Sequence, residues 1–384
     1  MTRRTSASSC RCGSDRPADR KPIALRRLRL RDFRCFARLD WRPPQGPLLL
    51  LGANGSGKTS LLEAAYLAAT TRSFRTGQID ACTRRGAGGF AVEAEVGEAP
   101  TRELTLELRA GVRRRRLDGR DASLAEHLEV LPILAWGPDD TEIVAGGPEH
   151  RRRLLDRGLV HLRPLVVESL GRYRRALAEK RALLARGDRR GLEGWNGVLA
   201  RHGAEISGAR AGLAAEVDVA LGELASRHAP ELPPVGLRYR PSHPSALEGE
   251  AALAAALERA RAEESERRQP LLGPHRDRVE LVWDGEDARR VASAGERKAL
   301  GLLLLAALAT RLAAAGREPA LVLDDIDAEL DRGRLERLAG LFEAFSRRWL
   351  SSNRPQVWEG VGGLRRVLLE RPGEAPREGP GGGS

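Results

Sequence analysis

Lysine is scarce in this chain. Lys and Arg together number 65, yet lysine occurs only at positions 21, 58, 180 and 298. A compact ammonium on a flexible stem does not substitute for a planar guanidinium at a phosphate site. A lysine within a phosphate-binding pattern of so arginine-rich a chain is therefore unlikely to be there by chance, and Lys58 is such a lysine.

Aromatic residues and cysteines are also few. Aromatics make up 4% of the chain, so base stacking on an aromatic platform is not expected to dominate nucleic-acid binding. Of the four cysteines, Cys10 and Cys12 lack a second ligand pair, which argues against a zinc site and favours a reducing, cytoplasmic compartment. No apolar run reaches membrane-spanning length, and the N-terminus lacks the apolar centre of a secretory signal.

The charge balance is strongly basic. The net charge of +12 suits a polyanionic partner, either nucleic acid or a membrane surface. With so few aromatics, phosphate contacts from arginine are the natural mode of binding. The alternative is that the arginines reflect a GC-rich genome.

A glycine-rich segment follows the apolar run at 48–51 and opens a helical pattern. Strand, glycine-rich loop and helix, with the pattern G-x-x-x-x-G-K-[ST], predict a phosphate cradle for ATP. Lys58 would reach the β- and γ-phosphates, and Thr59 would hold Mg²⁺. The predicted ATP-binding residues are Gly52, Ala53, Asn54, Gly55, Ser56, Gly57, Lys58, Thr59 and Ser60.

A second buried strand is expected at 319–325, ending in Asp324 and Asp325. Opposite a phosphate-binding lysine, Asp324 would orient Mg²⁺ through its waters. Asp325 would be the base that polarises the attacking water. Lys58, Asp324 and Asp325 are thus the predicted catalytic residues, although an acidic strand end alone is more often a solvated turn.

A helix predicted at 295–315 begins with Ser293, Gly295 and Glu296. These residues either cap the helix or form a second phosphate-binding N-terminus. Because the glycine-rich loop already serves one side of the nucleotide, this helix end would meet the γ-phosphate of another subunit.

The pattern of elements predicts an α/β fold: a mixed sheet with flanking helices, a set of antiparallel strands, and an inserted, mostly helical second domain. Strands are expected near 23–30, 47–52, 90–117 and 130–136, and helices at 58–70, 149–230, 246–268 and 332–345. The expected units are a disordered extension (1–20), two parts of an ATPase head (21–140 and 271–371), a helical arm (141–270) and a disordered tail (372–384). No sustained heptad indicates a coiled-coil arm.

Together these motifs resemble the ABC-type ATPase heads of the SMC class, and most closely the RecF family. The resemblance covers about 23–370. It includes Arg72-Ser73-Phe74-Arg75 after the first helix. The more specific segments are the run from Gly146-Gly147-Pro148 to Asp156 and Gly273-Pro274-His275-Arg276-Asp277.

This resemblance implies an ATP- and Mg²⁺-dependent homodimer that closes head to head on DNA and hydrolyses ATP slowly. It implies binding to gapped or junction duplex and single-stranded DNA, and action with RecR and RecO to load RecA in recombinational repair and replication restart, in the cytoplasm at the nucleoid. Ser293, Gly295 and Glu296 would act across the dimer, and Asp331 would face the partner head.

Some positions depart from the family pattern. Ala294 is neutral, Arg278 stands where an acid is common, and Ser351-Ser352 replace threonines. No convincing glutamine occupies the loop that usually contacts Mg²⁺; Gln78 is a weak candidate, and Asp139 lies nearer that loop. The hydrolysis rate is therefore left open.

Other charged residues have two interpretations. The run Arg113, Arg114, Arg115 and Arg116 forms either a DNA contact or a solvated face of a hairpin. Arg151 to Arg153 at a helix start require an anion or an interface. His275 is either structural or close to the nucleotide or interface. Other functions left open are a different short-armed SMC-type repair ATPase, an ABC transporter subunit, and a non-hydrolysing basic DNA-binding scaffold.

Overall fold

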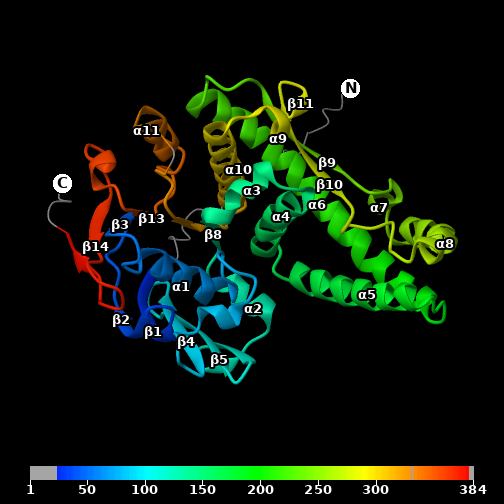
Figure 1. Cartoon of the computed structure of the whole chain (residues 1–384), viewed down its shortest axis with the longest axis horizontal. Coiled ribbons are helices and arrows are strands. Elements are labelled where there is room, and N and C mark those ends of the chain that lie inside the picture. Colours follow the sequence, from blue (N-terminus) through cyan, green and yellow to red (C-terminus); the bar gives the residue numbers. More distant parts are fainter. Residues whose placement is uncertain (1–23, 329, 331, 380–384) are drawn as a thin grey trace, which may run out of the picture.

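The computed structural model describes residues 24–328, 330 and 332–379, and in it two large sheets sandwich a helix while a helical arm projects to one side (Figure 1). Residues 1–20, expected to form an extension, and Asp331 lie outside the described residues. Within the described part of the chain, no helix is long and apolar enough to cross a membrane.

The central sheet has the strand order β15-β14-β3-β13-β12-β8. Four neighbouring pairs are parallel, and only β15 runs antiparallel. Two of its inner strands, β3 and β12, are continuous apolar runs because both faces are covered. The strands are β3 (Leu48–Leu51), β8 (Ile133–Trp136), β12 (Ala320–Leu323), β13 (Arg348–Ser352), β14 (Arg365–Leu368) and β15 (Arg377–Glu378).

The second sheet is antiparallel, with the order β2-β1-β4-β5-β6-β7. Its inner leucines and valines share one core with α1 (Lys58–Thr70), which lies between this sheet and the central one. Its outer face carries ion pairs such as Arg29–Glu93. The strands are β1 (Leu25–Phe33), β2 (Phe36–Trp41), β4 (Gly89–Val96), β5 (Arg102–Arg109), β6 (Val112–Leu117) and β7 (Arg120–Asp121).

The opposite face of the central sheet is covered by α10 (Ala294–Ala314), which is buried without a break from Lys298 to Ala309. The same core continues into α4 (Pro148–Leu162) and α6 (Leu192–His228) of the arm. The head and the base of the arm therefore share one hydrophobic core.

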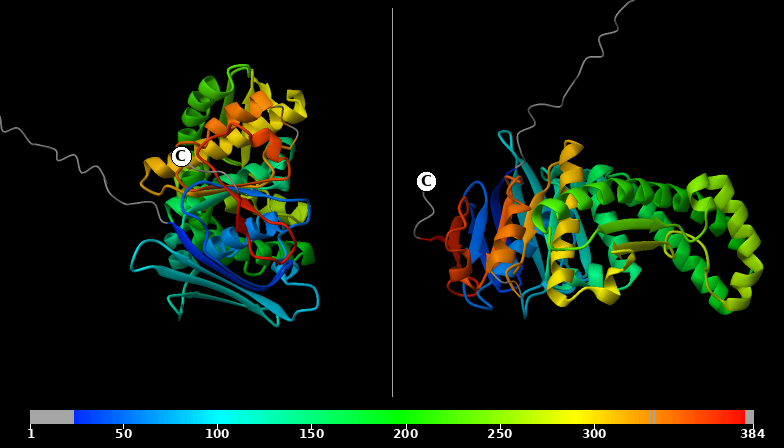
Figure 2. Two further views of the ribbon diagram at one scale, coloured as in Figure 1. Left: turned by 90° about the vertical axis from the view of Figure 1, so that its left-hand side faces the viewer. Right: turned by 90° about the horizontal axis from the view of Figure 1, so that it is seen from above.

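The arm extends away from the sheets, with α5 (Val166–Arg186) and α8 (Glu250–Arg267) reaching its far end (Figure 2). A three-stranded sheet of β9 (Val235–Arg240), β10 (Arg278–Trp283) and β11 (Glu286–Asp287) packs on α6. The remaining elements are short: α2 (Leu124–Val130), α3 (Glu142–Ala145), α7 (Ser245–Glu248), α9 (Ala288–Val291), α11 (Arg332–Gly340), η1 (Ile79–Cys82), η2 (Pro138–Thr141) and η3 (Pro355–Trp358).

Several expected boundaries are wrong. The strand expected from 130 begins at Ile133, because the capped helix α2 occupies residues up to Val130. The helix expected at 246–268 is divided at Gly249, whose φ is 118°. The helix expected to run to 345 ends at Gly340. The tail expected to be disordered from 372 contributes β15, which pairs with β14.

Candidate functional site

The glycine-rich loop joins β3 to α1 at the carboxyl edge of the central sheet. Gly55 and Gly57 have φ values of 81° and 107°, in the left-handed region that favours glycine. A Cβ atom on Gly52 would lie 2.2 Å from the carbonyl oxygen of Leu369. The backbone path of this loop therefore excludes side chains at Gly52 and disfavours them at Gly55 and Gly57.

Lys58 and Thr59 begin α1 with their polar atoms directed at the site. Lys58 Nζ donates to the carbonyl oxygens of Gly52 (2.8 Å) and Ala53 (3.0 Å). Burial lowers the pKa of Lys58, and the charges of Asp325 and Asp324 oppose that shift. The ammonium is held by neutral loop carbonyls and is available to an anion.

Asp324 and Asp325 follow β12 at the same sheet edge. Asp324 Oδ1 accepts from Thr59 Oγ1 (2.9 Å) and Ser351 Oγ (2.5 Å), and Ser351 Oγ accepts from the Asp325 amide (3.1 Å). Burial raises the pKa of both carboxyls. The structure thus brings together three residues that the sequence predicts as one site: Lys58, Thr59 and Asp324.

The site contains polar atoms without a protein partner. Ser56 Oγ, Asp324 Oδ2 and Asp325 Oδ1 are buried and accept or donate no hydrogen bond within the described structure. Buried polar groups normally have partners. Hydroxyl and carboxylate oxygens beside an ammonium and a positive-φ glycine loop fit the phosphates of ATP with Mg²⁺.

No group of three His, Cys, Asp or Glu residues in the described ranges could hold a metal ion by itself. Mg²⁺ is commonly bound through one or two carboxylates together with substrate phosphates, and the donor set of Thr59 and Asp324 is of that kind.

Two polar contacts that the sequence did not reveal lie beside the glycine-rich loop and the Asp324-Asp325 turn. Asn353 Nδ2 donates to Asn54 Oδ1 at 2.7 Å, and Ser352 Oγ donates to Asp327 Oδ2 at 2.7 Å. Ser352 is the last residue of β13, and Asn353 follows it directly. Their position at the end of a buried strand was the available signal, as it was for Asp324.

The start of α10 is a capping box. Ser293 Oγ accepts from the Glu296 amide, and Glu296 Oε2 accepts from the Ser293 amide at 2.8 Å. The capping interpretation is therefore confirmed, while the contact across a dimer stays a prediction. Lys298, one turn further along, donates to the carbonyl oxygens of Asp325 (3.2 Å) and Ala328 (2.5 Å). This bond joins α10 to the turn that carries Asp325.

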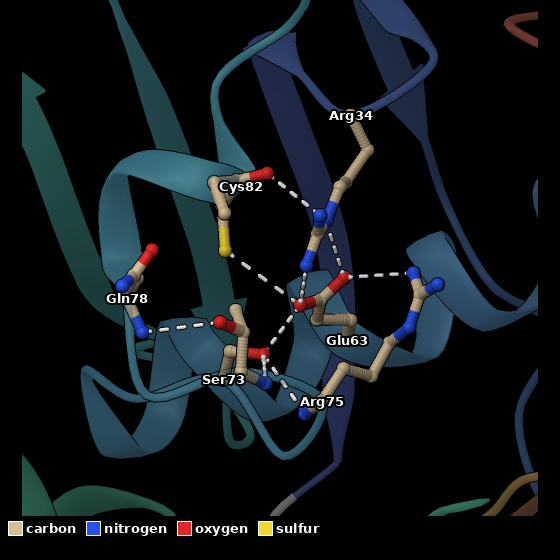
Figure 3. Close-up of polar contacts among 8 residues, drawn as sticks. Arg34, Glu63, Ser73, Arg75, Gln78 and Cys82 are labelled. Atoms are coloured by element: carbon tan, nitrogen blue, oxygen red, sulfur yellow. Dashed lines mark hydrogen bonds and ion pairs between the residues drawn. The ribbon is translucent and has the colours of Figure 1, made fainter.

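Glu63 on α1 is the centre of a buried charge cluster (Figure 3). Its carboxylate accepts two hydrogen bonds from Arg34 (2.8 and 2.6 Å), one from Ser73 (2.5 Å) and one from Arg75 (3.3 Å). Burial raises the pKa of the adjoining Cys82 thiol to about 12. The Arg72–Arg75 motif is thus fastened to the nucleotide-binding helix.

Gln78 and Asp139 are the two candidates for the loop that contacts Mg²⁺, and within the described structure neither forms a hydrogen bond with Thr59 or Asp324. Gln78 is exposed, and its backbone N–H donates to Thr76 Oγ1 at 3.1 Å (Figure 3). Asp139 is exposed in η2, directly after β8, which neighbours β12 in the central sheet.

The motifs at 146–156 and 273–277 form a buried network within the chain. Arg151 is buried and donates to the carbonyl oxygens of Val279 (2.5 Å) and Ile143 (3.1 Å), and Arg152 donates to that of Asp277 (2.6 Å). An intramolecular interface therefore accounts for Arg151 and Arg152, whereas Arg153 is exposed. The Asp277 carboxylate accepts from Ser207, Tyr239 and the Ser242 amide.

His275 belongs to the same network. Its Nδ1 lies 2.6 Å from Tyr173 Oη on α5, and burial lowers its pKa to about 3. This environment gives the neutral histidine a structural role in the arm.

The four arginines of β6 do not share one face. Arg113 and Arg115 lie opposite Leu108 and Leu106 on the inner face of the sheet. Arg114 and Arg116 lie on the outer face, where Arg116 is 3.7 Å from Glu107.

Comparison with known proteins agrees with this geometry. The family described as RecF/RecN/SMC N terminal domain matches residues 24–350. The DNA replication and repair protein RecF of Anaeromyxobacter sp. (strain Fw109-5) is 37% identical over 321 residues, covering 80% of this chain and 86% of that protein. The RecF of Myxococcus xanthus (strain DK1622) is 34% identical and covers 83% and 87%, respectively.

A solved structure shows the same fold. The recombination mediator protein RecF-ATPrS in the RecFOR pathway superposes with a TM-score of 0.81 at 23% identity, over 93% of this chain and 98% of that one. The fold is that of an ABC-type ATPase head with a helical arm, and the chain belongs to the RecF family.

Proposed function

We propose that this chain is an ATP-dependent, DNA-binding recombination mediator that dimerises when it binds ATP. The observation that carries the proposal is the meeting of Lys58, Thr59 and Asp324 at one sheet edge, with Thr59 Oγ1 2.9 Å from Asp324 Oδ1. The family supports a role in DNA replication and repair, and the similar solved structure is a recombination mediator in the RecFOR pathway.

Within one head, the amides of residues 52–57 and Lys58 bind the phosphates, and Thr59 and Asp324 hold Mg²⁺. Bound ATP supplies a phosphoanhydride bond whose hydrolysis gives ADP and phosphate. Asp325 orients the attacking water and accepts its proton; its raised pKa brings it closer to a working base. Ser351 holds Asp324 in place through its hydroxyl.

Across the dimer, the start of α10 meets the γ-phosphate bound by the partner head. In the capping box the Glu296 N–H already donates to Ser293 Oγ, so the N–H groups of Ala294 and Gly295 are available to an anion. Ser293 is exposed, as such a contact requires. Asp331 is proposed as a contact with the partner head.

The proposed ligands are gapped or junction duplex DNA and single-stranded DNA, and the proposed partners are RecR and RecO, with RecA loaded as the outcome. ATP hydrolysis ends the DNA-bound state, so the chain is a weak ATPase that works as a switch. We place it in the cytoplasm, at the nucleoid.

The test is sedimentation and binding to gapped duplex DNA, with and without ATP and Mg²⁺, for wild type, Lys58→Met and Ser293→Arg. We expect ATP to produce a DNA-bound dimer of the wild type only. Lys58→Met should lose ATP binding, whereas Ser293→Arg should bind ATP and remain monomeric. If neither the sedimenting mass nor DNA binding changes with ATP or with either substitution, the chain is a passive basic scaffold.

A further inference from the structure

One side of α5 carries arginines along its whole exposed face. Tyr173, Leu177, Lys180 and Leu184 are buried against the rest of the arm. At 3.6 residues per turn, Gly171, Ala178 and Ala185 lie on the exposed side of the helix. The arginines flank these small residues in two rows, Arg174 and Arg181 on one edge and Arg175 and Arg186 on the other, and all four are exposed.

These arginines have few counter-charges. In the described structure, Arg175, Arg181 and Arg186 form no ion pair or hydrogen bond through their side chains. Arg174 lies 4.0 Å from Asp156, but Arg210 already binds that carboxylate through two hydrogen bonds of 2.8 and 3.0 Å. Two exposed acids, Glu168 and Glu179, also lie on the exposed side of the helix, and Glu168 contacts Arg172 at 3.5 Å. The face therefore has a clear positive excess.

The positive surface continues from the arm onto the head. Helix α2 contacts both α5 and β6, so β6 lies near the arm. Arg113 Nη1 donates to the carbonyl oxygen of Thr71 at 3.3 Å, beside the exposed Arg72, and Arg115 Nε is buried without a hydrogen-bond partner.

The electrostatics link the two groups. Burial lowers the pKa of Arg113, and the charges of Arg115 and Arg72 add to that shift, with Asp80 opposing it. Partial burial and then the charge of Arg72 lower the pKa of Arg174. The charge of Arg72 therefore acts on both Arg113 of the head and Arg174 of the arm, and a bound anion would relieve this mutual repulsion.

Other arginines of the chain are neutralised locally. On the outer face of the antiparallel sheet, Arg27 and Arg29 each contact two or more acids. On α8, Arg261 lies 3.0 Å from Glu258 and Arg267 lies 2.8 Å from Glu263. An unneutralised stripe on α5 is thus a property of that helix and not of every arginine-rich surface here.

We propose that the phosphate backbone of duplex DNA lies along α5, in contact with its two rows of arginines, and reaches Arg72, Arg113 and Arg115 on the head. The inference rests on the proposed DNA-binding function and assigns it a surface. A helix of 21 residues is about 30 Å long, close to one turn of duplex. The small residues between the rows let the backbone approach closely, and phosphate contacts alone carry no sequence preference.

The test compares a triple variant, Arg174→Ala with Arg175→Ala and Arg181→Ala, with a matched control on α8, Arg259→Ala with Arg261→Ala and Arg267→Ala. Both remove three positive charges from exposed arm positions. Binding to duplex DNA is measured with ATP and Mg²⁺ from about 50 to 200 mM salt. The single variant Arg175→Ala repeats the measurement with minimal risk to folding.

We expect the α5 triple variant to weaken binding roughly 10- to 1,000-fold and to reduce the slope of log K against log salt by about 2 to 3, or about 1 for Arg175→Ala. The α8 control should keep the wild-type slope. An unchanged slope in the α5 variants, or equal losses in α5 and α8 variants, would overturn the assignment. If wild type itself fails to bind DNA, the proposed function is what fails.

Discussion

The hydroxyl of Thr59 donates a 2.9 Å hydrogen bond to the carboxylate of Asp324, which lies 265 positions later in the chain. The two residues follow different strands, β3 and β12, with β13 between them. Parallel strands that end at one edge bring their following residues together, and this edge holds both halves of the proposed Mg²⁺ site.

Thr59→Ala tests that relationship. It removes a ligand of the proposed metal, so we expect ATP affinity in Mg²⁺ to fall about 10-fold, a loss of about 1.4 kcal/mol. Affinity in EDTA should change little, because the phosphate-binding amides and Lys58 remain. Thr59→Ser keeps the hydroxyl and should restore binding; equal losses in Mg²⁺ and EDTA would speak against a metal role.

Asp325→Asn should abolish ATP hydrolysis and increase the stability of the folded protein. Burial raises the pKa of Asp325, so the folded protein binds its proton more tightly than the unfolded chain does. The charged carboxylate therefore costs stability as pH rises through that raised pKa, and the amide avoids this cost.

We expect Asp325→Asn to bind ATP, to lose hydrolysis, and to melt on the order of 2 °C higher at neutral pH without nucleotide. The gain should vanish near pH 3, where both states of the wild type are protonated. Asp139→Asn, at an exposed position, is the control. A variant that melts lower than wild type at neutral pH contradicts the argument.

Glu63→Gln should be strongly destabilising. Glu63 is fully buried and its charge is matched by Arg34 and Arg75. Removing one side of a buried ion pair leaves an uncompensated charge and costs about 3–5 kcal/mol. Glu93→Gln removes an acid from the half-exposed pair with Arg29 and should cost less than about 1 kcal/mol. Urea unfolding measures the free energy of unfolding of both variants. Similar losses would contradict a special stabilising role of the buried Glu63 cluster.

His275→Gln should flatten the pH dependence of stability. The pKa of His275 falls to about 3 in the folded state, below the ordinary value of 6.5, so its contribution is complete above pH 6.5 and is lost as pH falls toward 3. Between pH 8 and pH 4, we expect the free energy of unfolding of the variant to fall by on the order of 2 kcal/mol less than that of the wild type. Urea midpoints from pH 4 to 8 provide the measurement. Tyr173→Phe keeps the histidine and should keep the dependence; a variant profile parallel to wild type would exclude His275 as its source.

The glycine-rich loop and the Asp324-Asp325 strand were predictable because each is a local pattern. A strand, a loop and a helix adjoin in sequence, and the loop chemistry requires particular residues at fixed spacing. The helix at 58–70 and the hairpin of β5 and β6 follow for the same reason.

The Glu63 cluster could not be predicted in this way. Glu63 reads as an ordinary acid on an amphipathic helix, and its partners come from a turn at Arg34 and a loop at Ser73 and Arg75. The turn before β2 was also hidden, since Arg34 adopts a φ of 51° without being glycine. Which arginines of α5 share a face depends on packing against the rest of the arm, and that is a tertiary property.

The position of β3 has a consequence for synthesis of the chain. Residues 48–51 hydrogen-bond to β13 on one side and to β14 on the other. Both partner strands leave the ribosome roughly 300 residues later, so the strand that carries the nucleotide loop emerges early and waits for both neighbours. The central sheet around β3 is therefore completed only when residues up to 368 are available, and a chain stalled before residue 348 lacks both strands that pair with β3.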